Sequence, residues 1–152
     1  MSLESVKAFF AYKAPEIEVI ELPTSTATVA LAAEAHGVEP GQIAKTLSFS
    51  AKDQTILIVT RGDARIDNRK FKDRFGTKPR MLDAKSVRNE TSHPVGGVCP
   101  FGLPNALPVY CDLSLKSFEV VVPAAGATNS AVRIAPQRIA ELVSAEWIDV
   151  CQ

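Results

Sequence analysis

The clearest alternation of apolar and polar positions lies in the middle of the chain, where two strand patterns flank a short polar turn. Residues 44–50 and 54–60 surround the tripeptide Ala51-Lys52-Asp53. The second segment contains Ile56-Leu57-Ile58-Val59, an apolar and largely β-branched run that is typical of a buried strand. The pattern therefore predicts a β-hairpin whose second strand lies inside the protein.

Helical patterns occupy both ends of the chain and the stretches around this hairpin. They are indicated by an apolar face, a terminating glycine, a capping side chain or an initial proline. The predicted helices cover residues 2–12, from Thr24-Ser25-Thr26 to 35, 67–75, 84–89 and 137–144, the last opened by Pro136.

Short strands are predicted between the helices, at residues 17–22, 107–111, 118–123, 131–134 and 147–150, with a turn or short helix at 38–43. About five helices thus interleave with six or seven strands. This order favours a mixed α/β fold with a central curved sheet or barrel, and not a doubly wound sheet. With 152 residues and no linker or repeat, the chain is predicted to form one domain over residues 1–152.

Composition narrows the class of protein. Hydrophobic residues make up 46% and charged residues 22% of the chain, as in globular proteins. No membrane association is expected, since there is no long apolar run and no signal-peptide core at the N-terminus. Three widely spaced cysteines favour a reducing cytoplasm. The common ATP, dinucleotide and metal motifs do not occur, so neither a cofactor nor a metal is expected.

Positive charge is concentrated in residues 61–80, although the formal net charge of the chain is zero. Arg61, Arg65, Arg69 and Lys70 could together contact a phosphate backbone. The alternative is that these side chains form a solvated helix face.

The most unusual local composition is that of residues 91–103, the glycine loop, which runs Thr-Ser-His-Pro-Val-Gly-Gly-Val-Cys-Pro-Phe-Gly-Leu. Glycine allows close backbone approach and proline fixes the chain, so such a loop can present main-chain N–H groups to an oxyanion or a ribose hydroxyl. The alternative is a tight connection between two elements.

Four polar side chains are candidates for chemistry. Lys45 begins a predicted strand in apolar surroundings and could neutralise a phosphate or an oxyanion, or extend to solvent. His93 could be a general base or a packed histidine. Cys99 could be a nucleophile or a small buried residue. Asp112 could orient loop amides or a lysine, or cap the turn that follows it.

Several of these residues follow one another in an order that is found in a known family. The order is Lys45, then Gly96-Gly97-Val98-Cys99-Pro100-Phe101-Gly102, then Asp112, then Thr128-Asn129-Ser130. It resembles the YbaK/ProX family of aminoacyl-tRNA editing proteins, over roughly residues 23–143. The resemblance implies a mixed α/β fold. It also implies hydrolysis of the ester that joins a wrong amino acid to the terminal adenosine of a tRNA, most often tRNA for proline.

The resemblance also implies roles for individual residues. The catalytic groups would be Gly96 and Gly97, which hold the ribose and the carbonyl, and Lys45, which contacts a phosphate or the transition state. The substrate would be bound by Thr26, Thr46, His93, Val98, Cys99, Phe101, Gly102 and Asp112. The basic segment would attract the acceptor stem of the mischarged tRNA, and prolyl-tRNA synthetase could be a second partner. The oligomeric state does not follow from the sequence.

Three departures from the family leave the substrate open. No histidine stands in residues 123–127, Cys99 replaces the usual serine or threonine, and Thr46 replaces the asparagine of some alanine-editing members. Cysteine, alanine or another small amino acid could be removed. Two other functions also fit the residues: a binding module of the same fold without turnover, and a thiol hydrolase that uses Cys99 and His93.

Overall fold

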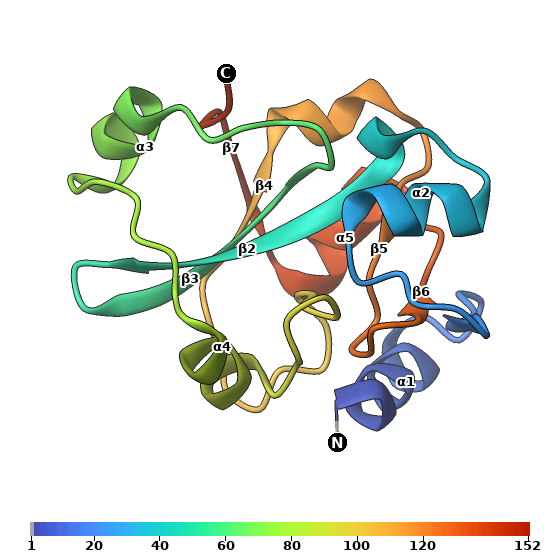
Figure 1. The fold of residues 1–152 in the computed structure, drawn as a ribbon. Helices are drawn as coiled ribbons and strands as arrows, with labels where there is room; N and C mark the ends of the chain where they lie inside the picture. The colour runs from blue at the N-terminus through green and yellow to red at the C-terminus, as the bar shows by residue number, and fades with distance from the viewer. Residues whose placement is uncertain (1) are drawn as a thin grey trace.

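A five-stranded mixed sheet forms the centre of the computed structural model, which describes residues 2–152 (Figure 1). Its strands are ordered β5-β2-β3-β4-β7, and a separate pair is formed by β1 and β6. The strand bounds are β1 Ile20–Glu21, β2 Ile43–Ala51, β3 Gln54–Arg61, β4 Val109–Asp112, β5 Val122–Pro123, β6 Ser130–Ala131 and β7 Glu146–Ile148. The predicted mixed α/β fold is confirmed, with the sheet curled as a half-barrel and not closed.

The β2–β3 hairpin is the longest-paired part of this sheet and confirms the strongest sequence prediction. The two strands are antiparallel and in register from Ala44 with Arg61 to Ala51 with Gln54. Lys52 and Asp53 form the turn with φ of 49° and 64°, the left-handed geometry that a two-residue hairpin turn of right-handed twist requires. Strand β5 joins β2, β4 joins β3, and β7 joins β4, all in parallel.

Five α-helices and two 3₁₀ helices surround the sheet within residues 2–152. Their bounds are α1 Ser2–Lys13, α2 Val29–His36, η1 Pro40–Gln42, α3 Asn68–Phe75, α4 Ala84–Thr91, η2 Leu113–Ser117 and α5 Pro136–Val143. Capping side chains define several starts: Thr28, Asp67 and Asp83 each accept main-chain N–H bonds in the first turn of their helix. Helix α2 therefore begins after Thr28 and not at the predicted cap, residues 24–26.

Three predicted strands are much shorter than expected. The strand predicted at 118–123 is reduced to β5, because Asp112 caps the 3₁₀ helix η2 and the chain pairs with β2 only from Val122. The strands predicted at 17–22 and 131–134 are reduced to β1 and β6, which pair with each other through two residues each. All three strands depend on partners that are distant in sequence.

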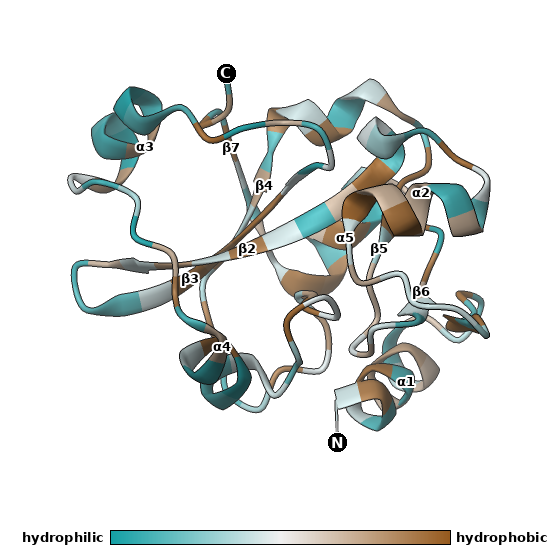
Figure 2. Ribbon diagram, viewed as in Figure 1, coloured by the Kyte–Doolittle hydropathy of each residue, from teal (hydrophilic) through white to brown (hydrophobic). Residues whose placement is uncertain are grey.

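The sheet separates the two larger of three apolar clusters. One lies toward α1, α5 and the glycine loop and includes Leu57, Val59 and Phe101. The other lies toward α3 and includes Phe49, Ile58 and Phe71. Figure 2 shows the outer surfaces of α3 and α4 as largely hydrophilic, whereas the central strands carry much of the apolar character. Alternate residues of β2 and β3 therefore face different clusters.

Candidate functional site

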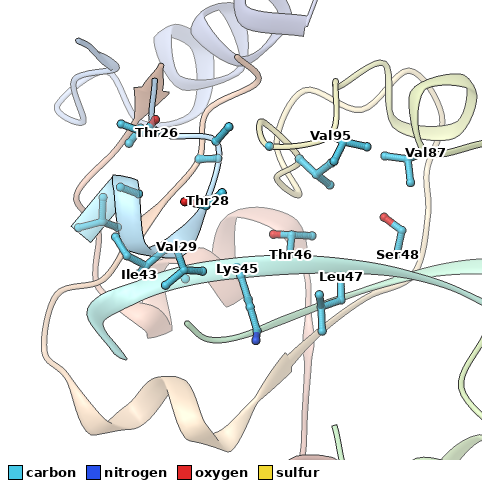
Figure 3. A pocket seen from close by; sticks show the side chains of 18 of the residues that line it. Thr26, Thr28, Val29, Ile43, Lys45, Thr46, Leu47, Ser48, Val87 and Val95 are labelled. Carbon is cyan, nitrogen blue, oxygen red and sulfur yellow. The ribbon is translucent and has the colours of Figure 1, made fainter. Parts of the chain in front are cut away.

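A cavity of about 290 Å³ opens beside β2, between the start of α2 and the glycine loop (Figure 3). Its floor is β2, from Ile43 to Ser48. Residues 26–29 and Ala32 form one wall, Val95, Gly96 and Val98 form another, and Met81, Leu82, Val87, Val122, Ala124, Ser130 and Ala131 complete the lining. The cavity thus joins segments that are far apart in sequence.

The lining is apolar with a few hydroxyl groups. Hydroxyls come from Thr26, Thr28, Thr46, Ser48 and Ser130. Among the lining residues there is no histidine, cysteine, aspartate or glutamate, and Lys45 is the one charged residue. The cavity can therefore hold a small group and offer it hydrogen bonds. Its lining has no imidazole or carboxylate to act as a general base and no thiol to act as a nucleophile.

Five of the residues predicted to bind substrate or catalyse line the cavity. They are Thr26, Lys45, Thr46, Gly96 and Val98. Thr26 is held in place because its hydroxyl donates to the Thr128 carbonyl at 3.2 Å and its N–H donates to the same oxygen at 2.6 Å. The glycine loop and the segment before α2 thus form one site with β2.

Lys45 extends from β2 to the opposite side from Thr46 and Ser48 (Figure 3). Its Nζ donates to the Ala64 carbonyl at 2.6 Å, and the side chain is half-buried. Burial lowers the pKa of Lys45, while the nearby Cys151 and Asp63 act to raise it. The ammonium group does not approach the glycine loop, so of the two predicted roles the geometry favours contact with a phosphate outside the cavity.

The two neighbouring glycines of the loop have different surroundings. Gly96 has a φ of 91° and lines the cavity. Gly97 does not line it: its N–H donates to Pro94 at 2.9 Å and its carbonyl accepts from Gly126 at 3.0 Å. A Cβ on Gly97 would lie 2.8–2.9 Å from main-chain atoms of Ala127. The predicted use of the Gly97 N–H by a substrate therefore conflicts with its role in the turn.

His93, Cys99 and Phe101 lie behind the loop, inside the apolar cluster. Each is 0% exposed. The Nε2 of His93 lies 2.9 Å from the Phe101 carbonyl and 3.5 Å from the Cys99 Sγ. Desolvation lowers the pKa of His93 and raises the pKa of Cys99 to about 12. These side chains pack beneath the loop on the side away from the cavity. Neither Cys99 nor His93 lines the cavity, so a substrate bound there would not meet a Cys99–His93 nucleophile.

The burial of the cysteines leads to a chemical prediction. Cys99, Cys111 and Cys151 are all buried, and burial raises the pKa of each thiol to about 12. We expect iodoacetamide at pH 8 to leave the folded protein unlabelled and to label all three thiols in denaturant, measured by mass spectrometry, because the thiolate is the reactive form. Rapid labelling of Cys99 with loss of deacylation would instead support the thiol hydrolase.

Gly102 and Asp112 serve the fold. A Cβ on Gly102 would lie 2.7 Å from main-chain atoms of Ser5, so this glycine lets the loop lie against α1. Asp112 is 1% exposed. Its carboxylate accepts the N–H of Ser114 at 2.9 Å and of Val150 at 2.8 Å. Of the predicted alternatives for Asp112, the structure thus shows that it caps the turn that follows it. The same carboxylate also holds the C-terminal segment through the Val150 N–H.

The basic residues predicted to bind tRNA divide into two pairs. Arg61 forms an ion pair with Asp63, and Lys70 forms one with Asp149 and also donates to the Cys151 carbonyl. Arg65 and Arg69 are exposed. Arg65 lies near the Lys45 ammonium group, which donates to the carbonyl of the neighbouring Ala64, so a phosphate that met Arg65 could also meet Lys45.

Several lining residues were not predicted. Ser48, Val95 and Val87 line the cavity (Figure 3). The period of two along a strand places Ser48 on the same face as Thr46, so this residue could have been found from the sequence. Val87 could not, because only the tertiary fold brings α4 to the cavity.

Within residues 2–152 no helix is both long enough and apolar enough to cross a bilayer. No three histidine, cysteine or acidic side chains in that range come close enough together to hold a metal ion.

Comparison with known proteins gives a family and close relatives. The model of the aminoacyl-tRNA editing domain matches residues 24–142. The uncharacterized protein YwhH of Bacillus subtilis is 50% identical over 154 residues, covering 100% of this chain and 98% of that protein. Proline--tRNA ligase of Moorella thermoacetica is 37% identical over 79 residues, which are 51% of this chain and 14% of the ligase.

A solved structure agrees with these matches. The crystal structure of a protein proposed to be a trans-editing enzyme for prolyl-tRNA synthetase has a TM-score of 0.91 and 32% identity, covering 99% of this chain and 97% of that one. The predicted resemblance is confirmed by the family model, which spans the hairpin, the cavity and the glycine loop. The chain belongs to the aminoacyl-tRNA editing domain family.

Proposed function

We propose that the protein is a trans-editing deacylase that hydrolyses the ester of a mischarged tRNA, with tRNA for proline carrying a small wrong amino acid as its substrate. The observation that carries this proposal is the cavity beside β2, whose lining has no acidic, imidazole or thiol side chain. Such a site suits a substrate that is already activated, as an aminoacyl ester is, and that needs positioning more than a protein nucleophile.

The size of the cavity supports a small acyl group. Its volume of about 290 Å³ lies at the lower end of the roughly 300–1,000 Å³ of ordinary ligand sites. An aminoacyl group would occupy it, with the terminal ribose at its mouth near Gly96. The tRNA body would remain outside, where Arg65 and Arg69 are exposed and would contribute affinity without reading sequence.

The proposed reaction needs only water. The oxygen of a water molecule bonds to the ester carbonyl carbon, the bond between that carbon and the ribose oxygen breaks, and a proton passes to the ribose oxygen. A hydroxyl group of the substrate would assist the attack, because the lining offers no side-chain base. No cofactor enters this scheme.

The proposed role predicts a cytoplasmic protein, because tRNA is charged in that compartment. It also predicts prolyl-tRNA synthetase as a partner that delivers the substrate.

The test uses tRNA for proline charged separately with alanine, cysteine, serine, 2-aminobutyrate and proline. We expect rapid deacylation of one or more small wrong amino acids with proline spared, measured as loss of labelled amino acid from tRNA over the rate without protein. Retention of all five esters, together with measurable tRNA binding, would contradict the proposal and favour the binding module without turnover.

A further inference from the structure

The outer edge of β2 has a gap in its pairing, and the gap faces the cavity. On this edge β5 pairs with β2 only at Ile43 and Ala44. Pairing resumes with the segment around Met81, where the N–H of Leu82 donates to the Ser48 carbonyl at 3.1 Å and the N–H of Ser50 donates to the Arg80 carbonyl at 2.8 Å. Between these two segments the edge of β2 borders the cavity.

The directions of the peptide groups follow from these bonds. Successive residues of a strand point their N–H and C=O groups to opposite edges. Because Ser48 and Ser50 both bond outward to residues 80–82, Thr46 also points its N–H and C=O outward. Those two groups lie in the gap, and neither takes part in the described pairing of β2 with β5 or with residues 80–82.

The Thr46 side chain adds a third polar group at the same place. Its Oγ1 is buried and has no hydrogen-bond partner among the described residues. Three other hydroxyls of the lining are already used: Thr26 and Ser130 donate to main-chain carbonyls, and Thr28 caps α2. A buried polar group without a partner is costly, so a ligand that supplies partners at Thr46 is favoured.

We propose that the open edge of β2 at Thr46 binds the aminoacyl group as if it were one added strand residue, with the Thr46 carbonyl accepting from the substrate α-amino group. The Thr46 N–H then donates to the substrate carbonyl, as in strand addition to a sheet edge. With no carboxylate in the lining, oxygen atoms of this kind are the available ligands for an α-ammonium group. The inference rests on the proposed deacylase function.

The pairing also sets the direction of the substrate side chain. In a hydrogen-bonded antiparallel pair, opposing side chains lie on the same face of the sheet. The substrate side chain would then lie beside Thr46, on the face where Figure 3 shows Ser48 and Val95. Residues on that face, and not Lys45, would therefore contact it.

The first test compares three esters of one tRNA. The parent is the aminoacyl-tRNA that the protein removes fastest, the second is its α-hydroxy analogue made by nitrous-acid deamination, and the third is its N-acetyl derivative. Rates are divided by spontaneous hydrolysis, since the esters differ in reactivity. We expect the enhancement to fall about 10-fold to 100-fold for the α-hydroxy ester, as for loss of a hydrogen bond to a charged group, and at least as far for the N-acetyl ester.

The outcomes separate this inference from the proposed function. Equal enhancement for the parent and the α-hydroxy ester would overturn the binding of the amino group while leaving the deacylase intact. If the protein removes no aminoacyl group from any tRNA, the proposed function itself fails.

A second test changes the main chain. Incorporation of the α-hydroxy analogue of threonine at position 46 replaces the Thr46 N–H by an ester oxygen, and the matched control does the same at Ser50, whose N–H bonds to Arg80. We expect the Thr46 ester to lose deacylation about 10-fold with little change in thermal midpoint. The Ser50 ester should lose stability and keep deacylation. Equal deacylation by the Thr46 ester and the Ser50 ester would overturn the inference. If neither ester protein folds, the comparison of the three substrate esters still tests it, because that comparison uses the unmodified protein.

Discussion

Replacing Lys45 by methionine is expected to lower deacylation of the preferred mischarged tRNA about 10-fold to 100-fold, mainly through a higher KM. The loss corresponds to a hydrogen bond to a charged group, worth about 1.5–3 kcal/mol. Methionine retains an unbranched apolar chain and removes only the ammonium group. The measurement is steady-state deacylation over a range of tRNA concentrations, with Lys45→Arg as the variant that keeps the charge.

The geometry explains why KM is the expected parameter. The Lys45 Nζ bonds to the Ala64 carbonyl, near Asp63 and on the other side of β2 from Thr46. Under the proposed function it would contact a phosphate of the acceptor end, and it would not contact the ester carbonyl inside the cavity. A charge that binds substrate and transition state equally changes KM and leaves kcat nearly constant.

A short substrate gives the sharpest control for Lys45. An aminoacylated adenosine without a 5′ phosphate should be hydrolysed equally by the parent and by Lys45→Met, since it lacks the group that the lysine would bind. Lys13→Met, at the exposed C-terminal end of α1, should not change the rate on tRNA. A loss of kcat on both substrates would contradict phosphate binding and place the lysine in the chemical step. If Lys45→Met had a lower thermal midpoint and unchanged kinetics, the role of Lys45 would be to hold the Ala64 segment in place and not to bind substrate.

Much of the fold could be predicted because its signals are local. The β2–β3 hairpin follows from two strand patterns on either side of a short polar turn, and α3 follows from the basic run that ends at Gly76. The cavity could be predicted only in part. It depends on where β5 stops pairing with β2 and where residues 80–82 begin, and no local pattern specifies contacts between such distant segments.

The side chains of the glycine loop show the same limit. His93 and Cys99 are close in sequence to Gly96, which left a chemical role open for both, yet the loop turns them into the core. The direction of the Lys45 side chain, in contrast, could have been predicted. Lys45 alternates with Thr46 and lies on the same face of β2 as Leu47 and Phe49, which belong to the cluster near α3.

Substitution of Gly97 by alanine is expected to remove both stability and activity. A Cβ there would lie 2.8–2.9 Å from the N, C and O atoms of Ala127, and a peptide unit cannot move aside as a flexible side chain can. Overpacking of this kind typically costs about 1–3 kcal/mol and sometimes more. For a domain of this size that is a fall of roughly 2–12 °C in thermal midpoint. Deacylation should fall about 100-fold, since a displacement near 1 Å can cost that much.

The matched control is Gly41→Ala. A Cβ on Gly41 would also be close to another residue, 2.7 Å from the Arg61 Nε, but that atom belongs to a long side chain that can take another rotamer. The thermal midpoint of Gly41→Ala should therefore stay close to that of the parent. If both variants melted alike, the close approach of the glycine loop to Ala127 would not be what fixes the loop. If Gly97→Ala kept its stability and lost deacylation, the loop would be constrained by catalysis and not by packing, and Gly97 would regain the catalytic role that the sequence predicts.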